Sequence, residues 1–196
     1  MPILGVTASS ISGHLIAPDL GVMFPIGSIT LNANASTVTF SSIPQTYTHL
    51  QLICMTRITR TNNDPSSNQL SYNGDSGANY AYHGIFAGAN SVAPDSGGGG
   101  SLSTMYIGTN ASNGTAAGTY APMIIDILDY SKTNKYKVAR SITGFSQNTS
   151  SSGNRSVAVR SGLWTNTNAI TSMTFNPNVN QFMTGSTFTL YGIKGE

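Results

Sequence analysis

The sequence predicts an all-β protein: an antiparallel β-sandwich, jelly-roll-like, with an irregular apolar N-terminal arm. Three observations predict this class. The 196 residues include 26 Ser, 23 Thr, 18 Asn and 21 Gly, all poor or mediocre helix formers. Apolar residues alternate with polar ones in many short segments, which is the side-chain period of a β-strand. Clusters of turn residues separate these segments at fairly regular spacing, as in sandwiches and barrels.

The N-terminal 26 residues differ from the rest of the chain. They contain no Lys or Arg, and Gly and Pro interrupt an irregular apolar pattern that suits neither a helix nor a regular strand. We therefore predict a docking arm over residues 1–26 and a β-sandwich domain over residues 27–196. The arm either lies on the domain's own core or docks on a partner subunit. The candidate docking residues are Ile3, Leu4, Leu15, Leu20, Met23 and Phe24.

About ten short strands are predicted after the arm. The clearest is 49–59, where Leu50, Leu52 and Cys54 share one face and Ile53 is an apolar exception on the other. Residues 91–101 contain the run Gly97–Gly100 and are expected to form a flexible loop. The other predicted strands lie at 28–40, 68–73, 79–88, 101–109, 122–131, 135–145, 155–164, 170–176 and 186–195.

Charge and cysteine content exclude several classes of function. The chain has 9 basic and 7 acidic residues, a net charge of +2 and no basic run, so no nucleic-acid partner is expected. Its one cysteine, Cys54, excludes an internal disulfide framework and a multi-cysteine zinc site. No stretch reaches about 18 consecutive apolar residues, so no transmembrane helix and no membrane partner are predicted.

A catalytic site is not predicted either. The segment Gly74–Gly77 reads GDSG, a motif in which trypsin-like proteases carry their nucleophile, and His49, Asp64 and Ser76 occur in the order of a triad. Only 27 positions separate His49 from Ser76, however, which is too few for a two-barrel protease. The six Asp, one Glu and three His show no spacing that selects a carboxylate pair or a metal site. The sequence therefore predicts a protein that is not an enzyme and binds no cofactor or metal.

A cluster of aromatic and polar residues supports one binding hypothesis. Asp75, Tyr80, Tyr82 and His83 could form a sugar platform, in which a ring stacks on a pyranose while a carboxylate bonds its hydroxyls. The competing interpretation is that these alternating aromatic residues fill the core of the sandwich and form cross-strand pairs. Trp164, which follows an apolar strand, is expected to lie in the core.

Three segments resemble a family of tailed-bacteriophage virion structural proteins. They are TVTFSSIPQTYTHLQL at 37–52, NGDSGANYAYH at 73–83 and FTLYGIKG at 188–195, and they bracket residues 28–196 in the order found in that family. The family includes domains of head decorations, fibres and tails. The resemblance implies a jelly-roll-like sandwich and no catalytic residues.

The resemblance and the composition together predict a non-enzymatic virion structural protein. It would be a capsid decoration, cement or fibre-type subunit, made in the bacterial cytoplasm and held to the particle by apolar contacts. Its expected partners are other virion proteins, either the major capsid protein or a tail or portal protein, and further copies of itself, with a trimer favoured. The alternative is a carbohydrate-binding receptor-recognition module of a phage tail or fibre, with a host surface glycan as its partner.

Overall fold

The computed structural model describes residues 22–62, 64–88, 91–146 and 155–195. Within these ranges the chain forms strands and no helix, so it contains no helix that could span a membrane. The predicted all-β fold is confirmed. The strands are β1 (Met23–Thr30), β2 (Val38–Phe40), β3 (His49–Ile58), β4 (Ser66–Tyr72), β5 (Tyr80–Gly88), β6 (Ser91–Leu102), β7 (Met105–Ser112), β8 (Ala121–Leu128), β9 (Lys137–Phe145), β10 (Ser156–Trp164), β11 (Met173–Pro177) and β12 (Thr187–Ile193).

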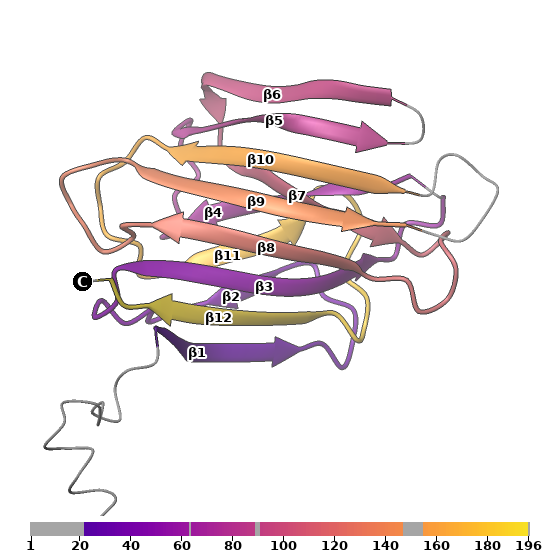
Figure 1. Cartoon of the computed structure of the whole chain (residues 1–196), viewed down its shortest axis with the longest axis horizontal. Helices are drawn as coiled ribbons and strands as arrows, with labels where there is room; N and C mark the ends of the chain where they lie inside the picture. The colour runs from indigo at the N-terminus through magenta and orange to yellow at the C-terminus, as the bar shows by residue number, and fades with distance from the viewer. Residues whose placement is uncertain (1–21, 63, 89–90, 147–154, 196) are drawn as a thin grey trace, which may run out of the picture.

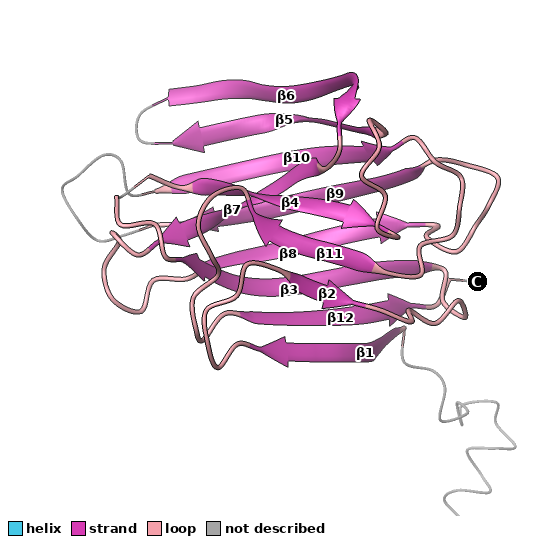
Figure 2. Cartoon of the chain, turned by 180° about the vertical axis from the view of Figure 1, so that it is seen from behind, coloured by secondary structure: helices cyan, strands magenta, loops and turns pink. Residues whose placement is uncertain are grey.

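The strands form two layers. The large sheet has the order β1-β12-β3-β8-β9-β10-β5-β6, and all of its neighbouring strands are antiparallel. The small sheet has the antiparallel order β2-β11-β4-β7. Figure 1 shows the large sheet in front. Figure 2 views the molecule from the opposite side and shows the small sheet in front, lying across the large sheet. A short parallel pairing between β3 and β7 connects the two layers.

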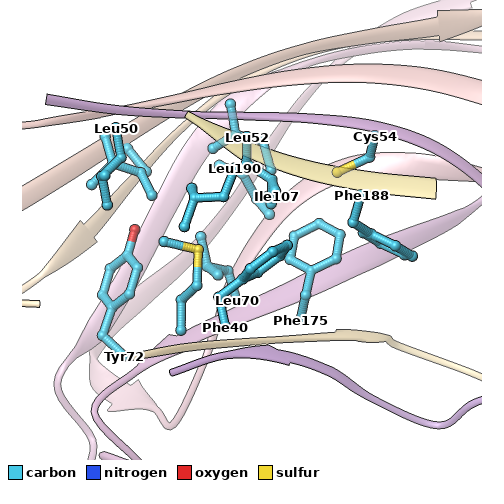
Figure 3. Packing of buried hydrophobic residues seen from close by; sticks show 14 of the residues in the cluster. Phe40, Leu50, Leu52, Cys54, Leu70, Tyr72, Ile107, Phe175, Phe188 and Leu190 are labelled. Atoms are coloured by element: carbon cyan, nitrogen blue, oxygen red, sulfur yellow. The ribbon is translucent and has the colours of Figure 1, made fainter. Parts of the chain in front are cut away.

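The core lies between the sheets because alternate side chains of each strand point inward. Leu50, Leu52 and Cys54 of β3 are buried, as the two-residue period predicts. They face side chains of the small sheet, among them Leu70 and Phe175 (Figure 3). Trp164 is also buried, as expected. Burial raises the pKa of the Cys54 thiol, which keeps this side chain protonated and unreactive.

The structured domain begins earlier than the predicted boundary at residue 27. Residues 23–26 belong to β1, which pairs with β12 from Met23 opposite Ile193 onward. Phe24 is half-buried, and its ring stacks on Tyr47 at 5.8 Å between centroids. Met23 remains exposed at the sheet edge. The other predicted docking residues, Ile3, Leu4, Leu15 and Leu20, lie outside the described residues.

The glycine-rich segment is a strand, so its prediction as a loop is wrong. It forms the edge strand β6, which pairs with β5 from Gly88 opposite Ser91 onward. Backbone pairing needs no side chain, and an edge strand accommodates a proline such as Pro94. Gly97 lies against the ring of Tyr82, and a Cβ atom there would be 2.6 Å from Tyr82 Cε1. Glycine therefore allows β6 to approach this ring.

Candidate functional site

The four predicted sugar-binding residues do not form one site. Tyr80 is buried and stacks on Trp164, and its hydroxyl donates a hydrogen bond to the Asp75 carbonyl oxygen at 3.2 Å. Burial raises the pKa of Tyr80 to about 12. Tyr82 points inward like Tyr80, whereas His83 is exposed on the opposite side of β5 because consecutive strand residues alternate between faces. The predicted platform is therefore not assembled, and the competing core interpretation holds for Tyr80.

Asp75 holds the turn before β5 in place. Its carboxylate accepts hydrogen bonds from Trp164 Nε1 at 2.7 Å, from the Gly77 backbone N–H at 2.8 Å and from Asn79 Nδ2 at 2.9 Å. These hydrogen bonds lower the pKa of Asp75, and the one from Trp164 contributes most. The carboxylate is therefore committed to internal partners and has a structural role.

We expect Asp75→Ala to lower the free energy of unfolding by about 1–3 kcal/mol, because the indole N–H of the buried Trp164 loses its acceptor. Urea denaturation followed by circular dichroism would measure the loss. The matched control is Asp64→Ala, which removes an exposed carboxylate paired with Arg60 at 3.2 Å. An exposed pair of this kind contributes no more than about 1 kcal/mol. Equal losses in the two variants would contradict the structural role of Asp75.

The same contacts make stability depend on pH. The pKa of Asp75 is lower in the folded than in the unfolded protein. The carboxylate therefore stabilises the fold at a pH above its unfolded pKa of about 3.9, and this stabilisation is lost as the pH falls through the folded pKa. The difference in unfolding free energy between the wild type and Asp75→Asn should therefore shrink below about pH 4. A difference that stays constant from pH 6 to pH 2.5 would contradict this assignment.

The first and last of the three segments that carry the phage resemblance contact each other. The Tyr47 ring of the first segment occupies the space that a side chain at Gly192 of the last segment would need. Thr48 Oγ1 accepts a hydrogen bond from the Gly195 backbone N–H at 2.8 Å. In the middle segment, Asn73 Oδ1 accepts from the Thr171 backbone N–H at 2.8 Å. These residues fasten loops and strand ends.

His49 and Asp64, the other two candidate triad residues, each have partners outside the GDSG segment. His49 Nδ1 accepts a hydrogen bond from the Asp129 backbone N–H at 2.9 Å, and the carboxylate of Asp64 lies against Arg60. His49 and Asp64 are thus engaged with different partners. Among the described residues, no group of three His, Cys, Asp or Glu side chains could hold a metal ion.

An apolar row on the large sheet is the strongest candidate for a functional surface. It lies on the outer face, which we define as the surface of the large sheet that points away from the small sheet. The side chains lie directly opposite one another in register across six strands: Ile53, Ile124, Ile142, Val159, Ile85 and Pro94. The exposed fractions of Ile85, Ile142 and Val159 are 58%, 56% and 51%.

Further apolar side chains extend this row over the outer face. They are exposed and lie on the same six strands: Met55, Leu128, Val138, Val157 and Val92. Exposed apolar surface of this extent is rare on a protein that works alone in water, and it marks an interaction surface. The outer face is therefore the part of the described structure best suited to bind another protein.

A neutral polar row lies beside the apolar row. Asp126 accepts hydrogen bonds from Gln51 at 2.7 Å and from Arg140 Nε at 3.1 Å. Their backbones are aligned in register across β3, β8 and β9. Because the two charges are paired, this row adds no net charge to the outer face.

Shallow hollows separate the exposed side chains. One of about 450 Å³ lies between His83, Ile85, Val138 and Val159. Two others, of about 250 and 190 Å³, lie beside Ile124 and Ile142. The outer face is thus corrugated, so that a partner can insert side chains between its ridges.

A separate groove lies on the inner side of β5 and β6. It has a volume of about 280 Å³, and the rings of Tyr82, Phe86 and Tyr106 line it. Asp95 and Arg160 lie at the same groove and form an ion pair, with Arg160 Nε donating to Asp95 at 2.7 Å. The Tyr82 and Tyr106 rings stack on each other at 5.0 Å. Of the predicted sugar-binding residues, only Tyr82 lines this groove.

Comparisons with known proteins do not indicate a function. No family model matches the chain, and no curated protein matches it in sequence. A solved protein of unknown function from Shewanella oneidensis MR-1 is similar at 8% identity, with 90% of this chain and 77% of that chain covered and a TM-score of 0.24. This similarity is too low to support an inference about fold or function. The phage resemblance therefore stays a prediction from the sequence.

Sequence reasoning did not identify the outer face. One signal was present, since Ile53 breaks the polar pattern on the second face of 49–59. The segment around Ile124 and Ile125 also places apolar side chains on both faces of one strand. Such a pattern predicts a strand buried on both sides, but it does not say what covers the second side.

Proposed function

We propose that this chain is a non-enzymatic structural subunit of a bacteriophage particle, of the capsid decoration, cement or fibre type, held in its assembly by apolar contacts. The observation that carries the proposal is the apolar row on the outer face. A sheet that exposes branched aliphatic side chains on six consecutive strands is suited to a protein whose working state is an assembly.

The hydrogen-bonding roles of the motif residues support a structural function. Asp75 is the clearest case, because its carboxylate is used internally on Trp164, Gly77 and Asn79. The phage assignment itself rests on the resemblance of residues 37–52, 73–83 and 188–195 to virion proteins. Under this proposal the protein is located in the virion, and its partners are other virion proteins and further copies of itself.

Truncation tests attachment to the particle. We expect a chain that lacks residues 1–21 to fold as the wild type does, because β1 begins at Met23 and its pairing with β12 is retained. We expect it to be absent from particles, because the apolar leader that includes Ile3, Leu4, Leu15 and Leu20 is then missing. Quantitative mass spectrometry of purified particles of the phage that encodes the chain would measure its copy number.

The control is a chain with Ser9 and Ser10 replaced by alanine, which keeps the apolar residues of the leader. Full occupancy by the truncated chain would contradict the docking role of the leader. Absence of the wild-type chain from purified particles would contradict the proposed function itself.

A saccharide-binding receptor module is the second candidate, favoured by the groove at Tyr82, Phe86 and Tyr106. Aromatic rings beside the polar pair Asp95 and Arg160 resemble the mixed lining of small-ligand sites. A glycan array separates the two candidates. Specific binding that is lost in Tyr82→Ala would favour the receptor module, and no binding by the wild type would favour the structural subunit.

A further inference from the structure

We propose that the outer face of the large sheet packs against the same face of a second copy, which forms a symmetric dimer. This inference rests on the proposed function in one respect, namely that the chain works within an assembly. It adds the identity of the partner on the outer face and the symmetry of the contact. A contact between identical surfaces has twofold symmetry. The expected oligomer is then a dimer or a multiple of a dimer, rather than the trimer favoured by the sequence.

The area of the outer face is sufficient for such a contact. The six strands that carry the apolar side chains, spaced about 4.8 Å apart, give a width of about 25–30 Å, and strands of nine residues such as β9 and β10 are about 30 Å long. This part of the face therefore measures about 800 Å², and two copies would bury about 1,600 Å² together. Stable interfaces bury about 1,200–2,000 Å² in total, and permanent homodimers bury more.

The chemistry of the outer face permits contact with a copy of itself. Its central side chains, Ile124, Ile142 and Val159, are aliphatic, as in the core of homodimer interfaces. The charged pair in the adjacent row, Asp126 and Arg140, is already joined within each chain. These two charges would therefore add no net like-charge repulsion between two copies, and each would keep its partner.

The shape of the outer face also suits self-association. Ridges formed by Ile142, Val159 and Ile85 stand beside hollows of about 190, 250 and 450 Å³. A surface with both ridges and hollows can interlock with a second copy when the two sheets cross at the usual angle of about 30°. The pair of chains would then form four stacked layers, with the two large sheets in the middle.

Sedimentation velocity of the full chain from about 1 to 100 µM tests the proposal. We expect the wild type to be a dimer. We expect Ile142→Asp with Val159→Asp to raise the dissociation constant at least 100-fold, because both carboxylates would be buried at the centre of the contact. Thr39→Asp is the matched control, since Thr39 is exposed on the outer surface of the small sheet. We expect this control to stay dimeric.

A second double variant tests the proposal in case the two aspartate substitutions prevent the chain from folding. Ile142→Thr with Val159→Thr keeps branched side chains that suit strands, and we expect a wild-type circular dichroism spectrum and a dissociation constant raised at least 10-fold. A wild type that stays monomeric at 100 µM, forms a trimer, or stays dimeric in both double variants would overturn the proposal. Loss of the dimer on removal of residues 1–21 would also overturn it, because the outer face alone would then be insufficient.

The outcomes separate this inference from the proposed function. A monomeric chain that is present in purified particles would overturn the dimer only. A dimer that is sensitive to substitution at Ile142 and Val159 but absent from particles would support the dimer and contradict the particle function.

Discussion

Replacement of Phe188 by alanine is expected to lower the free energy of unfolding by about 3–5 kcal/mol, the largest effect of any single substitution considered for this chain. Phe188 is fully buried on β12. Its ring packs edge-on against Phe175 at 5.9 Å and Phe182 at 5.0 Å between centroids. Phe175 belongs to the small sheet, so the cluster joins the two layers, and the smaller side chain would leave a cavity between them.

Thermal unfolding at one fixed protein concentration would measure the loss. For a chain of this length, 1 kcal/mol corresponds to about 2–4 °C in Tm, so the expected decrease is about 6–20 °C. Phe188→Leu fills most of the space and should cost much less. Tyr136→Ala is the aromatic control on the surface, because Tyr136 is 54% exposed. If Phe188→Ala lowered Tm no more than Tyr136→Ala does, the ring cluster would not be a main source of stability.

Residues that follow a two-residue period could be placed from the sequence. The sequence places Leu50, Leu52 and Cys54 on one face of a strand, and all three are buried. This works because burial of one face of a sheet imposes alternation directly on the amino-acid pattern. The fold class followed from the same signal repeated along the chain.

The glycine-rich strand β6 could not be recognised in this way. Its pairing with β5 is made by backbone atoms, and residues such as Gly97 carry no side chain whose periodicity could reveal the strand. The close approach of the Tyr82 ring explains why glycine stands at that position, but the approach depends on a neighbour brought there by the fold. Local propensity was overridden by a tertiary contact.

The candidate sites show the same limit. Tyr80, Tyr82 and His83 are close in sequence, yet strand geometry separates them into the core, the inner groove and the outer face. The residues of the apolar row are far apart in the sequence but adjacent in the structure. Ile53 and Ile85 are distant in sequence, and only the order of the strands in the sheet brings them into one surface. Proximity in sequence was therefore misleading for the first site, and the second required the topology.

Replacement of Arg160 by methionine is expected to cause the second large loss of stability. The Arg160 side chain is 3% exposed and ion-paired with Asp95 at the groove, and its guanidinium also donates to the Gly108 carbonyl oxygen. Arg160→Met keeps the aliphatic stem but leaves the half-buried carboxylate and the carbonyl without their donor. Breaking a buried pair on one side costs about 3–5 kcal/mol. Because 24% of the Asp95 side chain is exposed, water compensates in part, and we expect a loss of about 2–4 kcal/mol.

A double-mutant cycle with Asp95→Asn would isolate the interaction. If the loss comes from an unpaired carboxylate, Asp95→Asn should cost less in the Arg160→Met background than in the wild type, with a coupling of at least about 1 kcal/mol. Arg60→Met is the matched control, because its partner Asp64 is 64% exposed and the pair lies on the surface away from the outer face. We expect that control to change stability by less than about 1 kcal/mol. Additive losses at Arg160 and Asp95 would show that the two side chains stabilise the sandwich through packing alone, and the ion pair would then have no part in holding β5 and β6 over the groove.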